Sequence, residues 1–584
     1  MSGQVSAVSL EQNEQFLKKA YEKALVPCML SILSGNINIL ADGILVGQRL
    51  GTDALAAINL SLPVYLVLCI VGSFIVSGTA VCSAKEIGNN QTGRAQKLYQ
   101  MSVFWCALGS VVITAAGLFG IKPLTAFLCP KGEASYLVME YTGVTLAGAL
   151  PKILIYIPFW YLRLDGRNRE VTWMMLVMGA GNVFLDILFL YAFDMGVAGA
   201  ALASVVATAA SCLLGFFWLC DKKSSFQIGL CVSVKDVAFL DILQAGSPSA
   251  MNNLFQTLRV MAVNALLLEY GGSELVAAFT ALNCISAFAE SVTGGVPQAA
   301  SAMLGIYSGE HDNQSALMLL KRQVKSGMPC CLIFSAVILT GADLIAGAYG
   351  LSVSLRFAFF CMALGMAPAL ICCILSGYYN VSGHAMWANL VILFRVFIMP
   401  CASLYLLCLE KQNPWLFLFF GEILTLLAWF IATGVYHHFH KNLSRYLLMD
   451  HTLEENGRVI NFSVHDDAQD ICSASSKITV FCEENDMLPK QVMRVSLAME
   501  ELMTVIASIN SKSGVSFDLR VYSLDGVIGI RIRYDGKEFN PLAPAEGERG
   551  EWDDLFMGVR MIEDLVETAM YQRTFGMNTL QIFI

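Results

Sequence analysis

Leu50-Gly51-Thr52-Asp53-Ala54-Leu55-Ala56-Ala57 and Tyr270-Gly271-Gly272-Ser273-Glu274-Leu275-Val276-Ala277-Ala278 are two versions of one motif, about 220 residues apart. Other positions correspond at a similar offset: Gly88 and Gly309, Pro27 and Pro248, and Tyr161-Leu162-Arg163-Leu164-Asp165-Gly166 and Tyr379-Asn380-Val381-Ser382-Gly383. Weak internal repeats of this kind, in a chain dominated by apolar residues, are typical of proteins built from two similar membrane-embedded lobes. The repeat therefore predicts a two-lobed fold.

The composition supports a membrane location for both copies. Hydrophobic residues make up 56% of the chain and charged residues 14%, with a mean hydropathy of +0.60, which lies outside the range of ordinary soluble domains. Apolar runs follow one another from about Ala24 to Tyr436, each near the ~20 residues that a membrane-spanning helix needs. From His437 onward charges return at ordinary density, which predicts a soluble tail.

Two compositional features have simple interpretations. Residues 1–23 are polar and contain no cleavable signal pattern, so the first apolar run is expected to be a retained membrane helix. The 18 cysteines lie singly or as adjacent pairs in apolar runs, without metal-ligand spacing, and are interpreted as buried and inert. Three histidines follow the last span: His437, His438 and His440. They are interpreted as a polar collar, with a metal site as the alternative.

The apolar runs predict an all-α polytopic membrane protein of 12 transmembrane helices in two six-helix bundles, with span centres near residues 36, 68, 109, 147, 182, 208, 256, 289, 337, 366, 397 and 425. The expected domains are a cytoplasmic segment (1–23), a first lobe (24–220), an inter-lobe loop (221–242), a second lobe (243–436), a linker (437–449) and a cytoplasmic domain (450–584). Basic residues gather in every second loop, for example around Lys222 and Lys321, so the positive-inside rule places both termini in the cytoplasm.

Two acids lie within apolar runs of the first lobe. Asp42 is toward the end of the first span, and Asp186 in the fifth span follows Asn182 by four residues, so these two side chains share one helix face. Ser204 in the sixth span is expected to join them. Ionisable groups at membrane depth usually face a cavity or a partner. The alternative is a purely structural role, in which Asp42 reaches the outer interface while Asp186 only hydrogen-bonds neighbouring helices.

These acids do not recur in the second lobe. Shifting Asp42 and Asp186 by the repeat offset leads to Val263 and Ser403, which are neutral. A carboxyl group in an apolar cavity holds its proton more tightly than in water, which is what coupling to a proton requires. With waters and neutral oxygens the same cluster would hold Na⁺ instead. H⁺ and Na⁺ both remain open as the coupling cation.

Three further charges lie within spans of the second lobe. Glu290 and Arg259 are expected either to face a cavity or to form an ion pair that holds neighbouring helices together. Arg395 is expected to be structural or to repel substrate.

Several stretches of the membrane domain resemble the multidrug and toxic compound extrusion (MATE) transporters, over roughly residues 20 to 440. They are Asn38-Ile39-Leu40-Ala41-Asp42-Gly43-Ile44-Leu45-Val46-Gly47, Leu164-Asp165-Gly166-Arg167, Asn182-Val183-Phe184-Leu185-Asp186 and Gly196-Val197-Ala198-Gly199-Ala200-Ala201-Leu202-Ala203-Ser204. The resemblance is to the prokaryotic branch, whose first-lobe acids bind the coupling cation. It implies that Asp42, Asn182, Asp186 and Ser204 form the coupling site, and that two bundles rock between inward-open and outward-open states.

The tail, residues 450–584, has the pattern of a two-layer α/β sandwich. Arg458 to Val464 alternates as a strand, Ala474–Asn485 and Lys490–Ile509 are predicted helices, and Phe517–Ser523 with Val527–Tyr534 form a predicted hairpin. A helix near Phe556–Val566 and two closing strands follow. This order resembles the GHKL ATP-binding fold in its anti-sigma-factor-kinase-like branch, through Leu497-Ala498-Met499-Glu500-Glu501, Asp535-Gly536-Lys537-Glu538-Phe539-Asn540-Pro541 and Met557-Gly558-Val559-Arg560.

The tail also departs from that family. The resemblance implies nucleotide contacts at Glu501, Asp535, Gly536 and Gly558, but the Mg²⁺-binding asparagine is replaced by Val505 and the adenine-reading aspartate by Tyr534, unless Asp535 substitutes for it. Since Mg²⁺ must organise the phosphates, phosphoryl transfer is not expected. A degenerate regulatory or interaction module is predicted, with ATP binding left open.

The leading hypothesis is an H⁺- or Na⁺-coupled antiporter, not an enzyme, that exports small amphipathic or cationic compounds. It would lie in the cell membrane of a prokaryote. The membrane domain would contact the lipid bilayer and small-molecule substrates, and the tail would bind a cytoplasmic protein. No nucleic acid and no cofactor are expected. The alternatives are a membrane sensor that signals through the tail, and a flippase of lipid-linked intermediates from the same superfamily.

Overall fold

The computed structural model describes residues 2–583 except positions 90, 129–133, 222–223, 228, 233–238, 344–354, 450–458, 486, 512–513, 525–526, 543–567 and 575–576. The chain divides into two compact units, one formed by Tyr21–Tyr436 and the other by Met1–Ala20 with His437–Ile584. The larger unit contains the helices of the membrane domain, and the smaller one contains the sheet of the tail.

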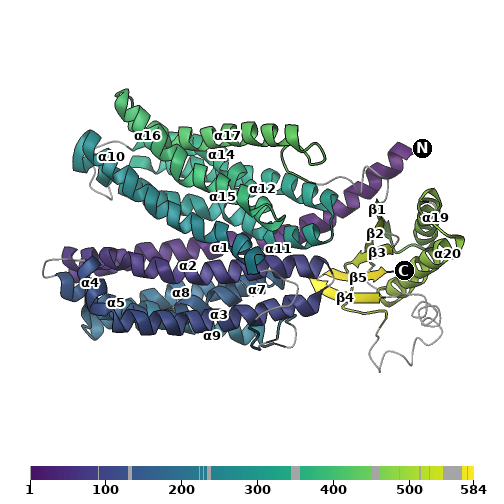
Figure 1. The fold of residues 1–584 in the computed structure, drawn as a ribbon, viewed down its shortest axis with the longest axis horizontal. Coiled ribbons are helices and arrows are strands. Elements are labelled where there is room, and N and C mark those ends of the chain that lie inside the picture. The colour runs from purple at the N-terminus through teal and green to yellow at the C-terminus, as the bar shows by residue number, and fades with distance from the viewer. Residues whose placement is uncertain are drawn as a thin grey trace. The chain divides into compact units, whose positions relative to one another are not determined.

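Within the larger unit the helices gather into two bundles, coloured purple to blue and teal to green in Figure 1. The first bundle comprises α1 (Ser2–Leu50), α2 (Thr52–Gly88), α3 (Thr92–Phe119), α4 (Ile121–Leu128), α5 (Ala134–Ala147), α6 (Ala149–Leu154), α7 (Tyr156–Leu164), α8 (Asn168–Ile187), the π-helix η1 (Leu188–Ala192) and α9 (Gly196–Leu219). The second comprises α10 (Phe239–Thr293), α11 (Gly295–Gly309), α12 (Asn313–Thr340), α14 (Arg356–Val381), α15 (Ala385–Ile392), the π-helix η2 (Leu393–Ile398), α16 (Met399–Leu409), the short η3 (Pro414–Leu416) and α17 (Phe417–Phe439).

The prediction of a mostly helical membrane protein is confirmed, whereas the count of 12 spans is not. Among the described residues, nine helices are long and apolar enough to cross a membrane. A tenth is added if the pair Ser135–Ala147 and Ala149–Leu164, bent by 59°, forms one span. The two predicted centres outside this set, near 36 and 256, fall in α1 and α10, which contain Asp42 and Arg259 respectively.

The internal repeat is visible in the backbone. Gly51 separates α1 from α2 with a φ of 85°, and its counterpart Gly272 breaks α10 with a φ of 75°. Gly166 and Gly383, which end the second pair of repeated stretches, have φ values of 78° and 93°. Residues with side chains rarely adopt this left-handed conformation, so glycine is needed at each turn. The repeated glycines thus mark corresponding turns in the two lobes.

A second pair of repeated glycines lies where the lobes meet. A Cβ placed on Gly88 in α2 would approach the carbonyl oxygen of Ile306 to 2.2 Å, and one on Gly309 in α11 would approach that of Lys85 to 2.3 Å. Because these neighbours are backbone atoms, neither position has room for any side chain. The lobes also share hydrogen bonds from Asn36 in α1 to α10, so the described lobes are in close contact.

The tail forms a five-stranded antiparallel sheet in the order β1-β2-β3-β5-β4. Its strands are β1 (Val459–His465), β2 (Ser516–Leu524), β3 (Val527–Tyr534), β4 (Thr568–Thr574) and β5 (Met577–Phe583), and its helices are α19 (Ala468–Glu484) and α20 (Pro489–Ile509). Alternate strand residues such as Phe517 and Leu519 join Ile478 and Leu502 of the two helices in one buried core. The predicted strands, hairpin and two helices are therefore present, while the predicted helix near Phe556–Val566 lies outside the described residues.

Candidate functional site

The three predicted polar residues of the first lobe lie together. Asp42 comes from α1, and Asn182 and Asp186 come from one face of α8. Asn182 Nδ2 donates a hydrogen bond to Asp186 Oδ2 at 3.2 Å, and the carboxyl group of Asp42 lies close enough to that of Asp186 to interact electrostatically. Two ionised carboxylates repel each other at short range, and a proton or another cation on the pair relieves this repulsion. The arrangement is therefore suited to holding a cation.

The same cluster holds acceptor oxygens without partners. The Oδ1 atoms of Asn38, Asp42, Asn182 and Asp186 are buried and receive no hydrogen bond from the described residues. Asn182 and Asp186 are almost fully buried, at 1% and 0% exposure. Buried acceptors normally find a donor or a cation, because leaving them unpaired costs about 1–3 kcal/mol each. This donor-poor set of oxygens fits a proton or a small cation.

A buried lysine next to these acids was not predicted. Lys152 lies in α6 with 7% exposure and interacts electrostatically with Asp42. Its Nζ also lies 5.3 Å from the centre of the Tyr65 ring, a cation–π contact. Lys152 could have been noticed in the sequence, because it is a lone basic residue beside a proline in an apolar run. Its distance from the acids along the chain gave no reason to group it with them.

Ser204 lies in α9, which packs against α8. Its backbone carbonyl accepts a hydrogen bond from Thr208 Oγ1 at 2.7 Å. No hydrogen bond between the Ser204 side chain and the two acids is found in the described part of the chain. Participation of Ser204 in the coupling site stays a prediction.

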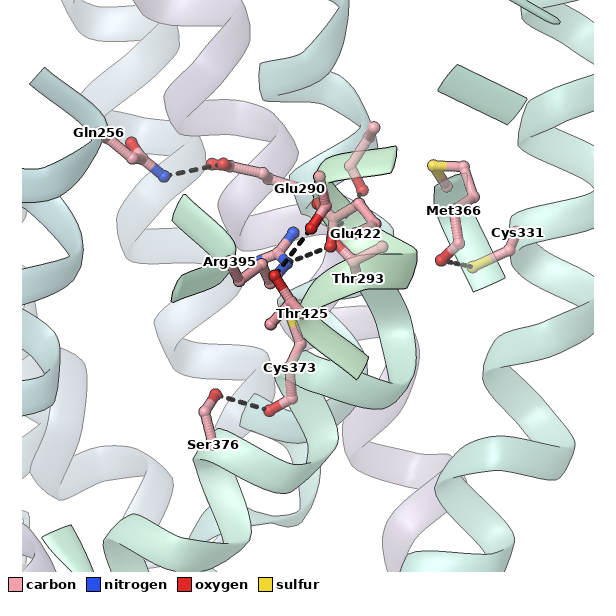
Figure 2. Close-up of polar contacts among 12 residues, drawn as sticks. Gln256, Glu290, Thr293, Cys331, Met366, Cys373, Ser376, Arg395, Glu422 and Thr425 are labelled. Atoms are coloured by element: carbon pink, nitrogen blue, oxygen red, sulfur yellow. Dashed lines mark hydrogen bonds and ion pairs between the residues drawn. The ribbon is translucent and has the colours of Figure 1, made fainter. Parts of the chain in front are cut away.

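The second lobe contains a separate charged cavity of about 80 Å³. Arg395 Nε donates to Glu422 Oε2 at 2.9 Å, and Gln256 Nε2 donates to Glu290 Oε1 at 2.7 Å (Figure 2). Arg259 also lines the cavity but forms no ion pair with any described residue, and its Nε is buried without a hydrogen-bond partner. Arg259 and Glu290 both line the cavity and interact electrostatically, so a cavity role and a helix-holding pair both stay predictions, as does the structural role of Arg395.

Glu422 is the second residue that sequence reasoning missed. It lies in α17 and is the only acid between Trp415 and Tyr436 in the sequence. A lone acid in an apolar run was a usable signal, but nothing in the spacing linked it to Arg395 in another helix.

The two positions at which the tail departs from the GHKL family are occupied by core residues. Val505 is 1% exposed and belongs to the buried core, as does Tyr534. The Tyr534 hydroxyl donates to the carbonyl oxygen of Phe539, and burial raises its pKa, so it remains neutral. Asp535 Oδ1 accepts from the backbone N–H of Ser516 at 3.1 Å. Glu501 is half-buried, a Cβ on Gly536 would meet the Asn510 side chain, and Gly558 lies outside the described residues.

Val505 offers a test of this core assignment. Replacing Val505 with Asn would restore the residue type expected of a Mg²⁺ ligand but would bury an amide against apolar side chains. We expect Val505→Asn to lower the unfolding free energy of the tail by about 1–3 kcal/mol, since an unpaired buried polar group costs that much. Thermal unfolding, monitored by proteolysis of the tail, measures the change. If the variant with Mg-ATP present is as stable as the natural protein or more stable, the assignment is contradicted.

Comparison with known proteins agrees with this architecture. Residues 27–192 match the MatE family model. The multidrug export protein MepA of Staphylococcus aureus (strain bovine RF122 / ET3-1) is 24% identical over 249 residues, covering 42% of this chain and 54% of that protein. The probable multidrug resistance protein YoeA of Bacillus subtilis (strain 168) is 23% identical over 351 residues, covering 58% and 74%. The match thus spans about half the length of MepA.

Solved structures share the fold of the membrane domain. One, described as the outward-facing conformation of a multidrug resistance MATE family transporter of the MOP superfamily, has a TM-score of 0.66 at 24% identity, covering 70% of this chain and 94% of that chain. A MOP superfamily transporter from Pyrococcus furiosus has a TM-score of 0.64 at 24% identity, with the same coverage. Two repeated helical bundles, with buried acids in the first, are the architecture of a multi-pass membrane protein. Residues 27–192 resemble the MatE family, and the membrane domain shares the fold of the MATE structures.

Proposed function

We propose that this protein is a cation-coupled antiporter that exports small amphipathic or cationic compounds. The observation that carries the proposal is the cluster of buried, unpartnered oxygens on Asp42, Asn182 and Asp186, in which the two acids lie close enough to interact electrostatically. Binding of the coupling cation to this pair in one conformation releases substrate, and loss of the cation in the other conformation allows substrate to rebind. Rocking of the two bundles would expose the cavity to each side in turn.

We propose further that the coupling cation is H⁺. Two buried carboxyl groups that interact electrostatically repel each other when both are ionised, and a single proton relieves this repulsion, which supports this choice. Lys152 also interacts with Asp42, and its positive charge opposes the uptake of any cation there, a proton as well as Na⁺. Tyr65 and Tyr141 are the other titratable groups that interact with Asp42, and both are neutral at physiological pH.

The remaining parts of the proposal follow from sequence. Both termini lie in the cytoplasm, by the positive-inside rule, and the protein resides in the cell membrane. The tail is a degenerate GHKL-like module that binds a cytoplasmic protein. The core positions of Val505 and Tyr534 support its degeneracy.

Export driven by two different gradients tests the proposal. Sealed vesicles containing the full chain and a fluorescent lipophilic cation would be given either a pH gradient or a sodium gradient of equal size. We expect the pH gradient to drive dye movement and the sodium gradient to leave the rate at that of protein-free vesicles. Movement driven by sodium at constant pH would contradict proton coupling, and movement with neither gradient required would contradict antiport.

Calorimetry of the full chain with Mg-ATP tests the sensor alternative. We expect no heat of binding, because the positions that would hold Mg²⁺ and adenine carry core side chains. Stoichiometric binding in the micromolar range would instead favour a signalling role for the tail. The flippase alternative needs a strongly basic cavity, whereas the second-lobe cavity contains Glu290 and Glu422 as well as its two arginines.

A further inference from the structure

The sheet of the tail has two faces of opposite character. Alternate residues of β2 and β3, such as Leu519 and Ile532, belong to the core that the sheet forms with α19 and α20. Because successive side chains of a strand point to opposite faces, the residues between them lie on the other face. This second face, called the arginine face below, carries three arginines and one aspartate: Arg520, Arg531, Arg533 and Asp518.

The arginine face is buried although it is charged. Arg520 and Arg531 are each 1% exposed, and Arg533 is 5% exposed. When helices cover one side of an antiparallel sheet, the other side is commonly in contact with water. Arginine is almost never fully buried unless it is paired. The burial of all three arginines therefore indicates that another part of the chain covers this face.

The charge of the arginine face is positive. Arg520 lies directly opposite Arg531 in the register of β2 and β3, where two like charges destabilise the pairing of strands. Asp518 Oδ2 accepts a hydrogen bond from Arg531 Nη2 at 3.0 Å and lies 3.7 Å from Arg533 Nη1. Asp518 is the only acid among the described residues of the five strands. A covering segment that carries carboxylates would match the charge of this face.

The first residues of the chain meet this requirement. Met1–Ala20 belongs to the same compact unit as the tail, although it lies at the opposite end of the sequence. Two acids of this segment, Glu11 and Glu14, are three residues apart in α1 and are therefore neighbours on the helix surface. Its lysines, Lys18 and Lys19, are exposed, so the positive charges of the segment do not lie against a covered surface.

We propose that the first turns of α1 dock on the arginine face of the tail, with Glu11 and Glu14 as partners of its arginines. From Tyr21 onward α1 belongs to the membrane unit, where it carries Asp42. One continuous helix thus joins the docked segment to the first-lobe acids. A cytoplasmic partner that binds the arginine face must displace this segment, so α1 regulates access to the tail. This regulation rests on the proposed export function for its meaning, whereas the docking itself needs no gradient.

Labelling of arginines in the purified full chain with phenylglyoxal, quantified by peptide mass spectrometry, tests the proposal. In the natural protein we expect Arg520 to react about 10-fold or more slowly than Arg445, which is exposed. The double variant Glu11→Lys, Glu14→Lys should raise the rate at Arg520 by about 10-fold or more, because repulsion replaces attraction between the helix and the sheet.

Two further variants identify what covers the arginine face. Lys18→Glu with Lys19→Glu reverses two exposed charges of the same segment and should leave the labelling rate unchanged. Glu551→Lys with Asp553→Lys reverses two acids between β3 and β4, the alternative acidic cover in the sequence, and should also leave it unchanged.

Four outcomes would overturn the inference. The first is fast labelling of Arg520 in the natural protein, and the second is an unchanged rate in the Glu11→Lys, Glu14→Lys variant. The third is release of the face by the reversal of Glu551 and Asp553. The fourth is faster hydrogen exchange of α20 in the Glu11→Lys, Glu14→Lys variant, which would show unfolding of the tail rather than undocking. Any of these, with pH-driven dye export intact, would leave the proposed function standing.

Discussion

Asp186→Asn is expected to reduce pH-driven export in sealed vesicles to the rate of protein-free vesicles. Asn182 already donates a hydrogen bond to Asp186, and Asp42 interacts with it electrostatically. An amide at position 186 keeps the size of the side chain and one acceptor oxygen but cannot gain or lose the coupling proton. The first-lobe cluster would then stay in one charge state through the cycle. Size-exclusion chromatography of the purified variant should be unchanged, because the substitution is isosteric.

Asp194→Asn is the matched control for this experiment. Asp194 belongs to the same lobe, but its side chain is 77% exposed and pairs with Arg49 at 3.1 Å. Exposed ion pairs contribute little, so the control should export at the rate of the natural protein. Full export activity of Asp186→Asn would remove the first-lobe acids from the coupling mechanism.

Gly88→Leu is expected to abolish export by a different route. Gly88 in α2 and Gly309 in α11 bring backbone to backbone where the two lobes meet. A leucine side chain needs the lobes to separate at this point, and overpacking of this kind costs about 1–3 kcal/mol or more. The contact conformation would lose population by about 5- to 150-fold relative to one with the lobes apart. Because alternating access requires both conformations, transport should fail in either direction.

Hydrogen exchange distinguishes this effect from a folding defect. The ends of α2 and α11 should exchange faster in Gly88→Leu than in the natural protein, whereas the tail sheet should exchange at the same rate. Gly93→Leu is the control, since Gly93 in α3 has no heavy atom within 4 Å of an added Cβ. Normal export by Gly88→Leu would show that the lobes need not meet at this contact during transport.

The sequence predicted the scaffold well because the repeated residues include glycines at positions with strict backbone requirements. Gly51 and Gly272 adopt the same left-handed turn, and Gly88 and Gly309 pack at one point between the lobes. Such requirements survive divergence because another residue cannot adopt the conformation or fit the space. The number of spans was predicted less well. The helices near residues 36 and 256 contain polar residues such as Asp42 and Arg259, which make them less apolar than the other spans.

The candidate sites were only partly predictable. Asn182 and Asp186 are four residues apart on one helix, so helical periodicity alone brought them together. Lys152 and Glu422 meet their partners through tertiary packing between helices distant in sequence, which no spacing rule encodes. The same limit applies to the second-lobe cavity, because α10, η2 and α17 contribute its charged residues and only their packing brings these together.

Proton release on substrate binding is the most direct test of a coupling site at Asp42 and Asp186. The purified full chain, in weakly buffered solution with a pH-sensitive dye, would be mixed with the lipophilic cation that the vesicles export. We expect substrate binding to the natural protein to release protons. We expect the Asp186→Asn variant to bind substrate without releasing any. Binding by the natural protein with no proton release, or equal release from Asp186→Asn, would contradict a coupling site at Asp42 and Asp186.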